Sequence, residues 1–337
     1  MKILYLAQEE WEEAFVKNKL PEDEVTTVLG SLEGNSTFDG SEVEALSIFV
    51  NSRIGGAEMD RFPKLKYIAT QSTGFDHIDL AEASKRGITV SNVPSYGVNT
   101  VAEFAFALIL ALSRRICEAN DRVSKEGSFS QADLQGFDLS GKTLGIVGIG
   151  HIGVYAARMA KGFGMNILVF DTRPDPALAA EIGFSYCELD DLLSRSDIIT
   201  LHVPYNRHTH HLMDAERLAK VKRGAYLINT ARGAVVDTNA LIAALENGTL
   251  AGAGLDVLEE EDDMQDERKL FKNPAPSAKE AMTVLENRYL MQHPRVIVTP
   301  HIAFDTKEAV ERILDTTVDN LKAFSAGAPI NVVAQKP

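Results

Sequence analysis

The sequence has few of the features that mark secreted, membrane or metal-binding proteins. It contains only two cysteines, Cys117 and Cys187, which cannot build a disulfide framework or a multi-cysteine metal site. Its longest apolar stretch, Val98 to Leu112, includes Glu103 and is too short to cross a bilayer. The opening MKILYLA turns acidic without a cleavage site, so it indicates a first strand and not a signal peptide. We therefore expect a soluble cytoplasmic protein without a metal ion.

Positive charge is also scarce. There are 34 Lys and Arg residues against 48 Asp and Glu residues, which gives a formal net charge of -14. Such a field repels nucleic acids and anionic membrane surfaces, so neither is an expected partner. It also repels small anions. An enzyme acting on them needs a local group of Arg, His or backbone N–H donors.

Strand-like and helix-like segments alternate along the chain, which is typical of parallel sheets covered by helices. At 337 residues the chain is long enough for two domains. The last helix, Thr306 to Ser325, is expected to return to the first domain. The sequence predicts two α/β domains of the Rossmann or flavodoxin type with a cleft between them: a substrate domain formed by 1–98 and 305–337, and a nucleotide domain formed by 99–304.

Three further stretches of the sequence have recognisable patterns. From Thr100 the sequence TVAEFAFALILALSRRICEANDRV predicts one long apolar helix, which could pack across a subunit interface. Six apolar runs then follow from Lys142, the number that a doubly wound nucleotide domain requires. The region 262–294 lacks a strand pattern and is helical only around Ser277 to Met291, so we expect a functional loop or surface excursion there.

The sharpest local motif is Gly148-Ile149-Gly150-His151-Ile152-Gly153, between an expected strand and an expected helix. Gly148 permits a tight turn, Gly150 lets the backbone approach a pyrophosphate, and Gly153 allows close helix–strand packing. The helix N-terminus favours the anion. A glycine-rich turn alone is weak support, but this position in a strand–turn–helix unit indicates a dinucleotide site.

Asp171 supports that interpretation. It lies 18 residues after Gly153 at the end of the apolar run Asn166 to Phe170. A carboxylate there can accept hydrogen bonds from the adenosine ribose and repel a 2′-phosphate, which favours NAD over NADP. Arg173 could weaken that discrimination, and a turn-forming Asp is the alternative.

Three residues form a candidate catalytic group: Arg232 in NTARGAVVD, Glu261 in GLDVLEEED and His301 in TPHIAFDT. All three follow expected strands of one parallel sheet, whose carboxyl ends meet at one edge. Arg232 can hold a carboxylate in a two-pronged contact. His301 can donate a proton to a carbonyl oxygen, and Glu261 would favour the charged imidazole. Each residue alone has an ordinary structural explanation, but the three together indicate catalysis.

Two other groups are less specific. The loop Gln71 to Asp79 can present the amides of Thr73 and Gly74 to a carboxylate, with Asp76 or Asp79 capping the next helix, although an ordinary turn fits equally well. His208, His210 and His211 have no carboxylate or cysteine at ligand spacing, so we expect a surface loop there and not a metal site.

Together these motifs resemble the NAD-dependent D-2-hydroxyacid dehydrogenases, and the resemblance runs from STGFDHIDL through VPSYGVNTVAEF, GIGHIG, HVP, NTARGAVVD and GLDV to TPHIAF. It implies catalytic roles for Arg232, Glu261 and His301, with Glu261 lying 29 positions after Arg232. It also implies D-stereochemistry and a homodimer. The implied NAD contacts are His151, Ile152, Asp171, Val203, Pro204, Thr209, Thr230, Ala231 and Asp256.

Within that family the chain is most similar to D-lactate dehydrogenases, through Tyr96, Phe304 and the long segment after Glu261. Aromatic walls would suit a small aliphatic 2-oxo acid such as pyruvate. Asp305 and the sequence VPSYGVN depart from that branch, so a glyoxylate, hydroxypyruvate or other 2-oxo acid reductase is the alternative. An NAD(H)-sensing protein of the corepressor type is a second alternative, because those proteins share the fold and the catalytic trio.

Overall fold

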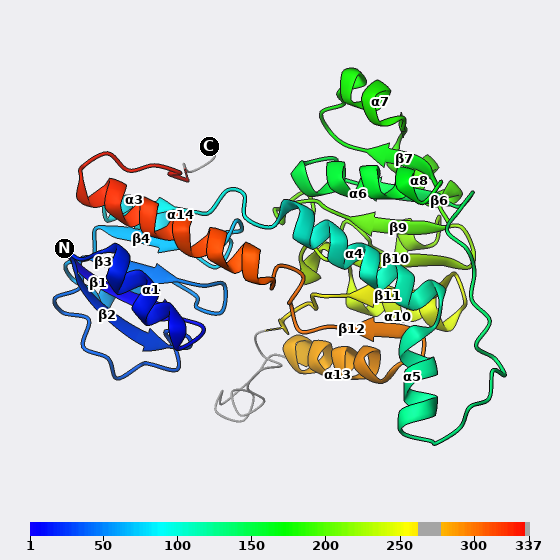
Figure 1. Cartoon of the computed structure of the whole chain (residues 1–337), viewed down its shortest axis with the longest axis horizontal. Coiled ribbons are helices and arrows are strands. Elements are labelled where there is room, and N and C mark those ends of the chain that lie inside the picture. Colours follow the sequence, from blue (N-terminus) through cyan, green and yellow to red (C-terminus); the bar gives the residue numbers. More distant parts are fainter. Residues whose placement is uncertain (262–277, 334–337) are drawn as a thin grey trace. The chain divides into compact units, whose positions relative to one another are not determined.

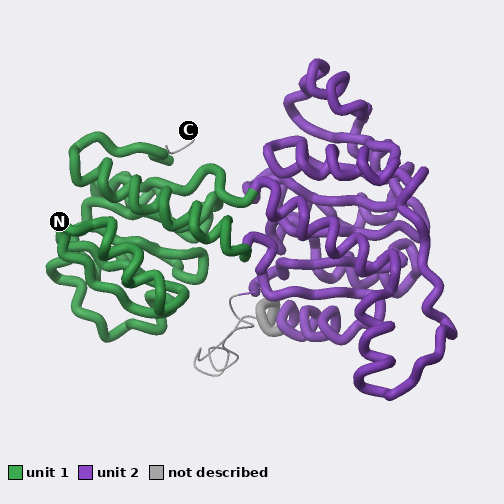
Figure 2. Tube along the Cα trace, viewed as in Figure 1, with its two compact units in different colours: residues 1–97, 305–337 green, residues 98–304 purple. Residues whose placement is uncertain are grey.

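The computed structural model describes residues 1–261 and 278–333. The chain separates into two compact units, residues 1–97 with 305–337 and residues 98–304 (Figure 2). The first unit is therefore discontinuous in sequence, and its boundaries differ by one residue from those expected.

Unit 1 is a five-stranded parallel sheet with helices on both faces (Figure 1). The strand order is β2-β1-β3-β4-β5, the flavodoxin-like order. The first part of the chain forms the sheet of unit 1, and the last part returns to this unit as one long helix. The elements are β1 (Lys2–Ala7), α1 (Trp11–Lys19), β2 (Glu24–Leu29), β3 (Ala45–Ile48), α2 (Gly56–Asp60), β4 (Tyr67–Thr70), α3 (Leu80–Lys85), β5 (Thr89–Ser91) and α14 (Lys307–Ser325).

Two apolar cores hold this sheet, because the side chains of a strand alternate between its faces. Leu4 and Leu46 belong to the core on one face, whereas Tyr5 and Ala45 belong to the core on the other. The second core includes residues of α14, and the ring of Tyr67 stacks on that of Phe324, with centroids 4.2 Å apart. The last helix thus joins a core built by the first residues of the chain.

Unit 2 is a seven-stranded parallel sheet in the order β12-β11-β10-β9-β6-β7-β8. Strands are added in one direction from β6 to β8 and in the other from β9 to β12, as in a doubly wound nucleotide domain. Its elements are α4 (Val98–Ser113), α5 (Ile116–Ser124), β6 (Thr143–Val147), α6 (His151–Gly162), β7 (Asn166–Phe170), α7 (Pro176–Ile182), β8 (Ser185–Tyr186), α8 (Leu189–Arg195), β9 (Ile198–Leu201), α9 (Ala215–Leu218), β10 (Ala225–Asn229), η1 (Gly233–Val235), α10 (Thr238–Glu246), β11 (Leu250–Leu255), α13 (Ala278–Gln292) and β12 (Val296–Val298).

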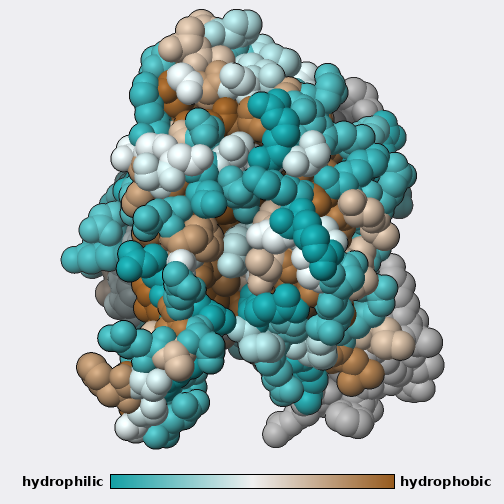
Figure 3. Space-filling model, turned by 90° about the vertical axis from the view of Figure 1, so that its right-hand side faces the viewer, coloured by the Kyte–Doolittle hydropathy of each residue, from teal (hydrophilic) through white to brown (hydrophobic). Residues whose placement is uncertain are grey.

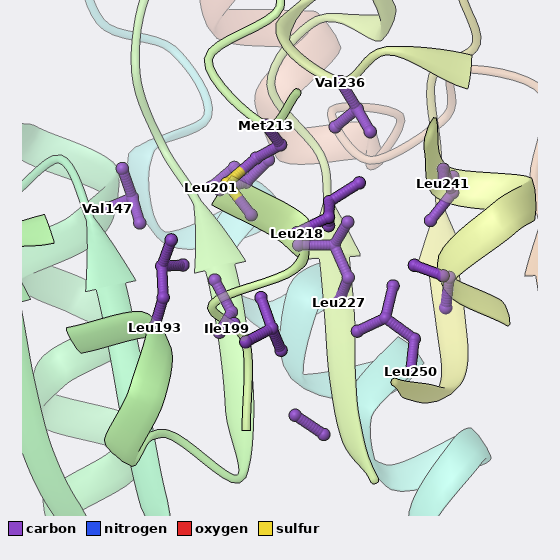
Figure 4. Packing of buried hydrophobic residues seen from close by; sticks show 14 of the residues in the cluster. Val147, Leu193, Ile199, Leu201, Met213, Leu218, Leu227, Val236, Leu241 and Leu250 are labelled. Carbon is purple, nitrogen blue, oxygen red and sulfur yellow. The ribbon is translucent and has the colours of Figure 1, made fainter. Parts of the chain in front are cut away.

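Both faces of the second sheet are covered. On one face, α4 and α6 pack against each other and bury side chains such as Ile109, Ile146 and Ala157. On the other, Leu193 of α8, Leu218 of α9 and Leu241 of α10 close over strand residues in the core drawn in Figure 4. The two cores fix the carboxyl ends of β6, β9, β10, β11 and β12, where the site residues lie.

Two sequence predictions about unit 2 are wrong. The single helix expected from Thr100 is two helices, because the chain leaves α4 at Arg114 and Arg115 adopts the left-handed conformation with φ of 51°. A non-glycine residue in that region ends a right-handed helix. The six expected strands are seven, since β8 is a two-residue edge strand too short to give a periodic pattern.

Hydrophilic residues dominate the face shown in Figure 3, and apolar atoms show mainly in recesses between them. None of the described helices is both long and apolar enough to span a bilayer.

Candidate active site

The glycine-rich turn between β6 and α6 has the shape of a dinucleotide cradle. Gly148 has φ of 95°, and a Cβ atom there would lie 2.8 Å from the carbonyl oxygen of His202. At Gly153 a Cβ would lie 2.2 Å from the Gly148 oxygen. Gly150, the N-cap of α6, differs because a Cβ there would meet no protein atom within 4 Å. Open space thus lies next to the helix N-terminus, where an anion is favoured.

This turn lies at the point where the strand order reverses, between β6 and β9, which is where ligands bind in such sheets. His202 follows β9, and its backbone N–H donates to Val147 of β6 at 2.8 Å. Its Nε2 lies 3.0 Å from the Thr200 hydroxyl oxygen. The atoms packed around the imidazole exclude water, and this desolvation lowers the pKa of His202 to about 4, so the side chain is neutral near pH 7.

Asp171 lies at the carboxyl end of β7 and organises its neighbourhood through both carboxylate oxygens. One accepts from the Ile149 N–H at 2.8 Å and the other from the Arg173 N–H at 2.8 Å. The carboxylate is therefore tied to the glycine-rich turn. Each oxygen still has a second lone pair that could accept from a ribose hydroxyl.

Of the remaining expected cofactor residues, His151 and Ile152 begin α6, and the others follow β9, β10 or β11. Thr230 is buried, and its hydroxyl has no hydrogen-bond partner among the described residues. A buried polar group without a partner is costly, so this hydroxyl fits a site that a bound ligand completes. Thr209 donates its hydroxyl to the Pro204 carbonyl at 2.7 Å and so closes the turn that follows Val203. His151 is exposed, and Ile152 and Ala231 are half-buried.

The structure brings His301 and Glu261 into contact. His301 follows β12, Glu261 follows β11, and His301 Nδ1 lies 2.6 Å from Glu261 Oε1. The other Glu261 oxygen accepts from the Leu258 N–H at 3.1 Å. A ring nitrogen bonded to a carboxylate fixes the orientation of the imidazole and leaves Nε2 for another partner. The pair thus has the geometry of an oriented general acid.

His301 has φ of 55°, a left-handed conformation that is unusual for histidine. The turn is held by the buried Asp256 carboxylate, which accepts from the Thr299 hydroxyl at 2.6 Å, the Ile302 N–H at 3.0 Å and the Ala303 N–H at 2.8 Å. Burial raises the pKa of Asp256, and these hydrogen bonds oppose the rise. Asp256 was expected at the cofactor. Its carboxylate holds the turn that presents His301, a role that its place in GLDV did not reveal.

Arg232 is placed next to the Glu261 loop by its neighbour Gly233. A Cβ at Gly233 would lie 2.0 Å from the carbonyl carbon of Leu258 and 2.4 Å from the Glu259 nitrogen, so only glycine allows this approach. The buried Asn229 side chain accepts from the Ala231 N–H and donates to the Arg232 carbonyl. Arg232, Glu261 and His301 therefore follow the adjacent strands β10, β11 and β12.

A second carboxylate–imidazole pair supports the loop before Glu261, and sequence reasoning missed it. Glu259 is buried, accepts from the Thr238 hydroxyl at 3.0 Å, and lies 2.8 Å from His211 Nε2. Asp237 lies 3.5 Å from the other nitrogen of that ring. No carboxylate stands at ligand spacing from His211 in the sequence, but the fold brings Glu259 and Asp237 to it from other segments. No metal-binding cluster occurs within residues 1–261 and 278–333.

In unit 1, the loop after β4 turns its carbonyl groups into the protein. The Ser72 carbonyl accepts from the Val93 N–H at 3.0 Å, and the Thr73 carbonyl accepts from the Asn92 side chain at 2.8 Å. The N–H groups of Thr73 and Gly74 make no hydrogen bond within the described part of the chain. C=O and N–H of one peptide point in opposite directions, so these amides face away from their carbonyl partners. They could receive a carboxylate.

The other expected substrate contacts lie on both units. Tyr96 is half-buried in unit 1, and its carbonyl accepts from Arg312 Nε at 2.6 Å. Phe304 is half-buried at the end of unit 2. Of the two candidate caps after the loop, it is Asp79 that accepts from the Glu82 N–H at the start of α3.

Comparison with known proteins places these features in a family. Residues 106–303 match the model of the D-isomer specific 2-hydroxyacid dehydrogenase NAD-binding domain. The glyoxylate reductase of Thermococcus litoralis is 43% identical over 300 residues, which cover 87% of this chain and 84% of that protein. The D-lactate dehydrogenase of Aquifex aeolicus, solved with NAD and lactic acid, is 35% identical with a TM-score of 0.85, covering 98% of this chain and all of its own. The pyruvate reductase of Chlamydomonas reinhardtii is 33% identical with a TM-score of 0.84, covering 98% of each chain.

Proposed function

From the premise that the chain belongs to the D-isomer-specific 2-hydroxyacid dehydrogenases and is an NAD-dependent oxidoreductase, we propose that it reduces pyruvate to D-lactate. The observation that carries the mechanism is the 2.6 Å contact between His301 and Glu261 in the sheet that also holds the glycine-rich turn. It provides a proton donor in the same unit as the nucleotide cradle.

In the proposed reaction, the bound nicotinamide supplies a hydride to the carbonyl carbon of the 2-oxo acid. His301 donates the proton from Nε2 to the carbonyl oxygen, while Nδ1 stays bonded to Glu261. Arg232 and the amides of Thr73 and Gly74 bind the carboxylate. The acid gains one hydride and one proton, so NADH and the protonated imidazole together balance the reduction.

The cofactor preference follows from Asp171 in this proposal. Its carboxylate could accept hydrogen bonds from the adenosine ribose of a bound dinucleotide, and a 2′-phosphate there would bring like charges together. Gly150 leaves space that a pyrophosphate would occupy, and the buried Thr230 hydroxyl, which has no partner among the described residues, could bond to a bound nucleotide.

Pyruvate is the first choice of substrate because Tyr96 and Phe304 offer aromatic surface to a methyl group. The solved neighbours named for D-lactate dehydrogenase and pyruvate reductase support it. Glyoxylate is the second candidate, favoured by the 43% identity to a glyoxylate reductase. It lacks the methyl group, so the same carboxylate and proton contacts would serve both acids.

The test is the loss of NADH absorbance with pyruvate, glyoxylate, hydroxypyruvate and longer 2-oxo acids, compared by kcat/KM. The highest value with pyruvate would support the proposal, and the highest value with glyoxylate would replace it by the second candidate. Chiral analysis of the lactate formed checks the D-configuration. No turnover of any 2-oxo acid by protein that binds NADH would overturn both candidates.

The proposal includes a cytoplasmic homodimer. The two unpaired cysteines fit a reducing compartment. The apolar helix α4 provides a surface on which a second copy could pack.

A further inference from the structure

Beneath the loop that presents the Thr73 and Gly74 amides lies a chain of side-chain hydrogen bonds. His77 Nε2 lies 3.1 Å from the Thr70 hydroxyl, and the Thr70 hydroxyl lies 2.7 Å from that of Ser72. The Ser72 hydroxyl donates to the carbonyl of Gly74 at 2.6 Å. Thr70 and Ser72 are buried, with 0% and 2% of their surface exposed. We call this the His77–Thr70–Ser72 chain.

The donor and acceptor of each hydrogen bond follow from the Gly74 carbonyl at the end of the chain. The Gly74 carbonyl can only accept, so the single hydroxyl proton of Ser72 is used there. The Ser72 oxygen must then accept from the Thr70 hydroxyl, which uses the only proton of Thr70. Thr70 in turn must accept from His77, so His77 Nε2 carries a proton. Only one arrangement of protons satisfies all three contacts.

The chain fixes a third peptide of the loop. The carbonyls of Ser72 and Thr73 are held by Val93 and Asn92, and the carbonyl of Gly74 is held by the Ser72 hydroxyl. Three consecutive peptides therefore have fixed orientations. The amide of Phe75, like those of Thr73 and Gly74, makes no hydrogen bond within the described residues and points away from the bonded carbonyl.

From this geometry we infer that His77, Thr70 and Ser72 are positioning residues for substrate, which hold the Gly74–Phe75 peptide so that three successive amides receive the carboxylate of the 2-oxo acid. The inference rests on the proposed function for the identity of the ligand. Prearranged donors bind an anion without the cost of ordering the loop at the time of binding. Loss of the chain would free the third peptide to rotate and weaken carboxylate binding.

The test compares Thr70→Val with Thr70→Ser in the NADH complex of the full-length protein. Valine keeps the shape of threonine and removes the hydroxyl, whereas serine keeps the hydroxyl. We expect Thr70→Val to raise KM for the 2-oxo acid, and the Kd of the carboxylate inhibitor oxamate, by about tenfold, as for one lost charge-assisted hydrogen bond. The value of kcat should change much less, and NADH affinity should stay unchanged, because the cradle lies in unit 2. Thr70→Ser should restore most of the wild-type KM.

A second pair tests the other end of the chain. His77→Gln retains an N–H donor at the place of Nε2, and His77→Leu removes it. The leucine variant should reproduce the KM effect of Thr70→Val, while the glutamine variant should show most of the wild-type affinity. The inference would be overturned if Thr70→Ser raised KM as much as Thr70→Val and His77→Gln as much as His77→Leu. An unchanged KM in Thr70→Val would overturn it as well.

A spectroscopic measurement separates this inference from the proposed function. The ¹⁵N resonances of labelled histidine should show a proton on His77 Nε2 in the wild-type protein, and this proton should lose its hydrogen-bonded signature in Thr70→Val. A His77 ring that is protonated only at Nδ1 would overturn the chain, even if the enzyme reduces 2-oxo acids. Wild-type protein that neither binds oxamate nor reduces any 2-oxo acid would refute the proposed function, whatever the tautomer.

Discussion

At the scale of the residue, His301 combines a proposed role as proton donor with an unusual backbone conformation. Its φ of 55° lies in a region that costs most L-residues roughly 1–2 kcal/mol, and asparagine tolerates it better than alanine. The contacts of Asp256 with Thr299, Ile302 and Ala303 hold this conformation. A test at position 301 must therefore distinguish the effect of losing the imidazole from the effect of a changed backbone conformation.

His301→Asn keeps a residue that accepts the left-handed conformation and removes the proton donor. We expect kcat to fall by roughly 100- to 10,000-fold, the usual contribution of a general acid, while NADH affinity stays close to wild type. His301→Ala should lose the same activity and also have a lower Tm. Steady-state kinetics, NADH titration and thermal denaturation measure the three quantities. Wild-type kcat in His301→Asn would remove the residue from the mechanism.

Glu12 is a buried carboxyl group in unit 1, with 2% of its surface exposed. One of its oxygens accepts from the backbone N–H groups of Gln8 and Glu9, and the other accepts from the Tyr5 hydroxyl. Burial raises the pKa of Glu12 despite these contacts. Since the folded-state pKa lies above that of the unfolded chain, folding favours the protonated form. The contribution of Glu12 to stability therefore falls as pH rises through the folded-state pKa.

Glu12→Gln mimics the protonated carboxyl group at every pH. The variant should match the wild type at about pH 4, and should have the higher free energy of unfolding at pH 8, where the wild type must keep a buried charge. Urea denaturation at both pH values gives the comparison. A variant that is less stable than the wild type at pH 8 would contradict this assignment.

A substitution at Gly150 can test cofactor binding without disturbing the fold. A Cβ there meets no protein atom within 4 Å, and the residue has an ordinary φ of -64°. Gly150→Ala should therefore leave Tm unchanged but place a methyl group where the pyrophosphate is expected, and so weaken NADH binding by at least about tenfold. Gly162→Ala, at the other end of α6 and equally open, is the matched control and should bind NADH normally. Calorimetric titration with NADH provides the readout, and an unchanged Kd for Gly150→Ala would move the pyrophosphate elsewhere.

At the scale of the element, the candidate catalytic group depends on how closely short segments approach one another. The η1 turn lies against the loop after β11, and Gly233 leaves no room there for a side chain. Glu259, His211 and Thr238 hold that loop through hydrogen bonds. The relative position of Arg232 and Glu261 is thus a property of two loops packed together.

Gly233→Ala should force these loops apart. The added methyl group would lie 2.0 Å from the Leu258 carbonyl carbon, so the backbone must shift. A displacement of about 1 Å can reduce turnover by about 100-fold, and we expect kcat/KM to fall by that order while NADH affinity changes less. Kinetics and NADH titration of the purified variant test this. Wild-type kcat/KM would show that the approach of the two loops does not position the catalytic residues.

At the scale of the whole molecule, the surface of α4 is unusual for a protein of net charge -14. Ala107 is exposed at the middle of this helix, and Phe104, Leu110 and Ala111 are half-buried beside it. The exposed Glu103 lies on the same face one turn before Ala107, and the stripe of small and apolar residues beside Ala107 suits close packing against a second copy of the chain. The proposed dimer would bury it.

Sedimentation at micromolar concentration should give twice the mass of one chain. Ala107→Glu places a charge on the stripe with a residue that favours helix, so it should give a folded monomer with unchanged helix content. Ala180→Glu, at a position of α7 outside the stripe, is the matched control and should remain a dimer. A wild-type monomer would refute the proposed assembly, and a dimeric Ala107→Glu would exclude this face.

The sequence alone determined the features that follow from local pattern. Alternating strand and helix periodicity predicted both parallel sheets, and the strand–turn–helix position of Gly148 to Gly153 predicted the nucleotide turn. Residues that follow strands of one parallel sheet meet at its carboxyl edge, so the order of motifs along the chain was enough to group Arg232, Glu261 and His301.

Only the tertiary structure decided features that depend on contacts between distant segments. The turn at Arg115 that ends α4 lies in a continuous helical pattern, and β8 is too short for a periodic signal. The Glu259–His211 contact spans 48 residues, so spacing could not predict it. Asp256 is a predicted cofactor contact, and only the structure shows that its carboxylate also holds the His301 turn, because a buried carboxylate bonds to the N–H groups that the fold brings within reach. Local propensities specify the elements, and long-range packing specifies which polar groups become partners.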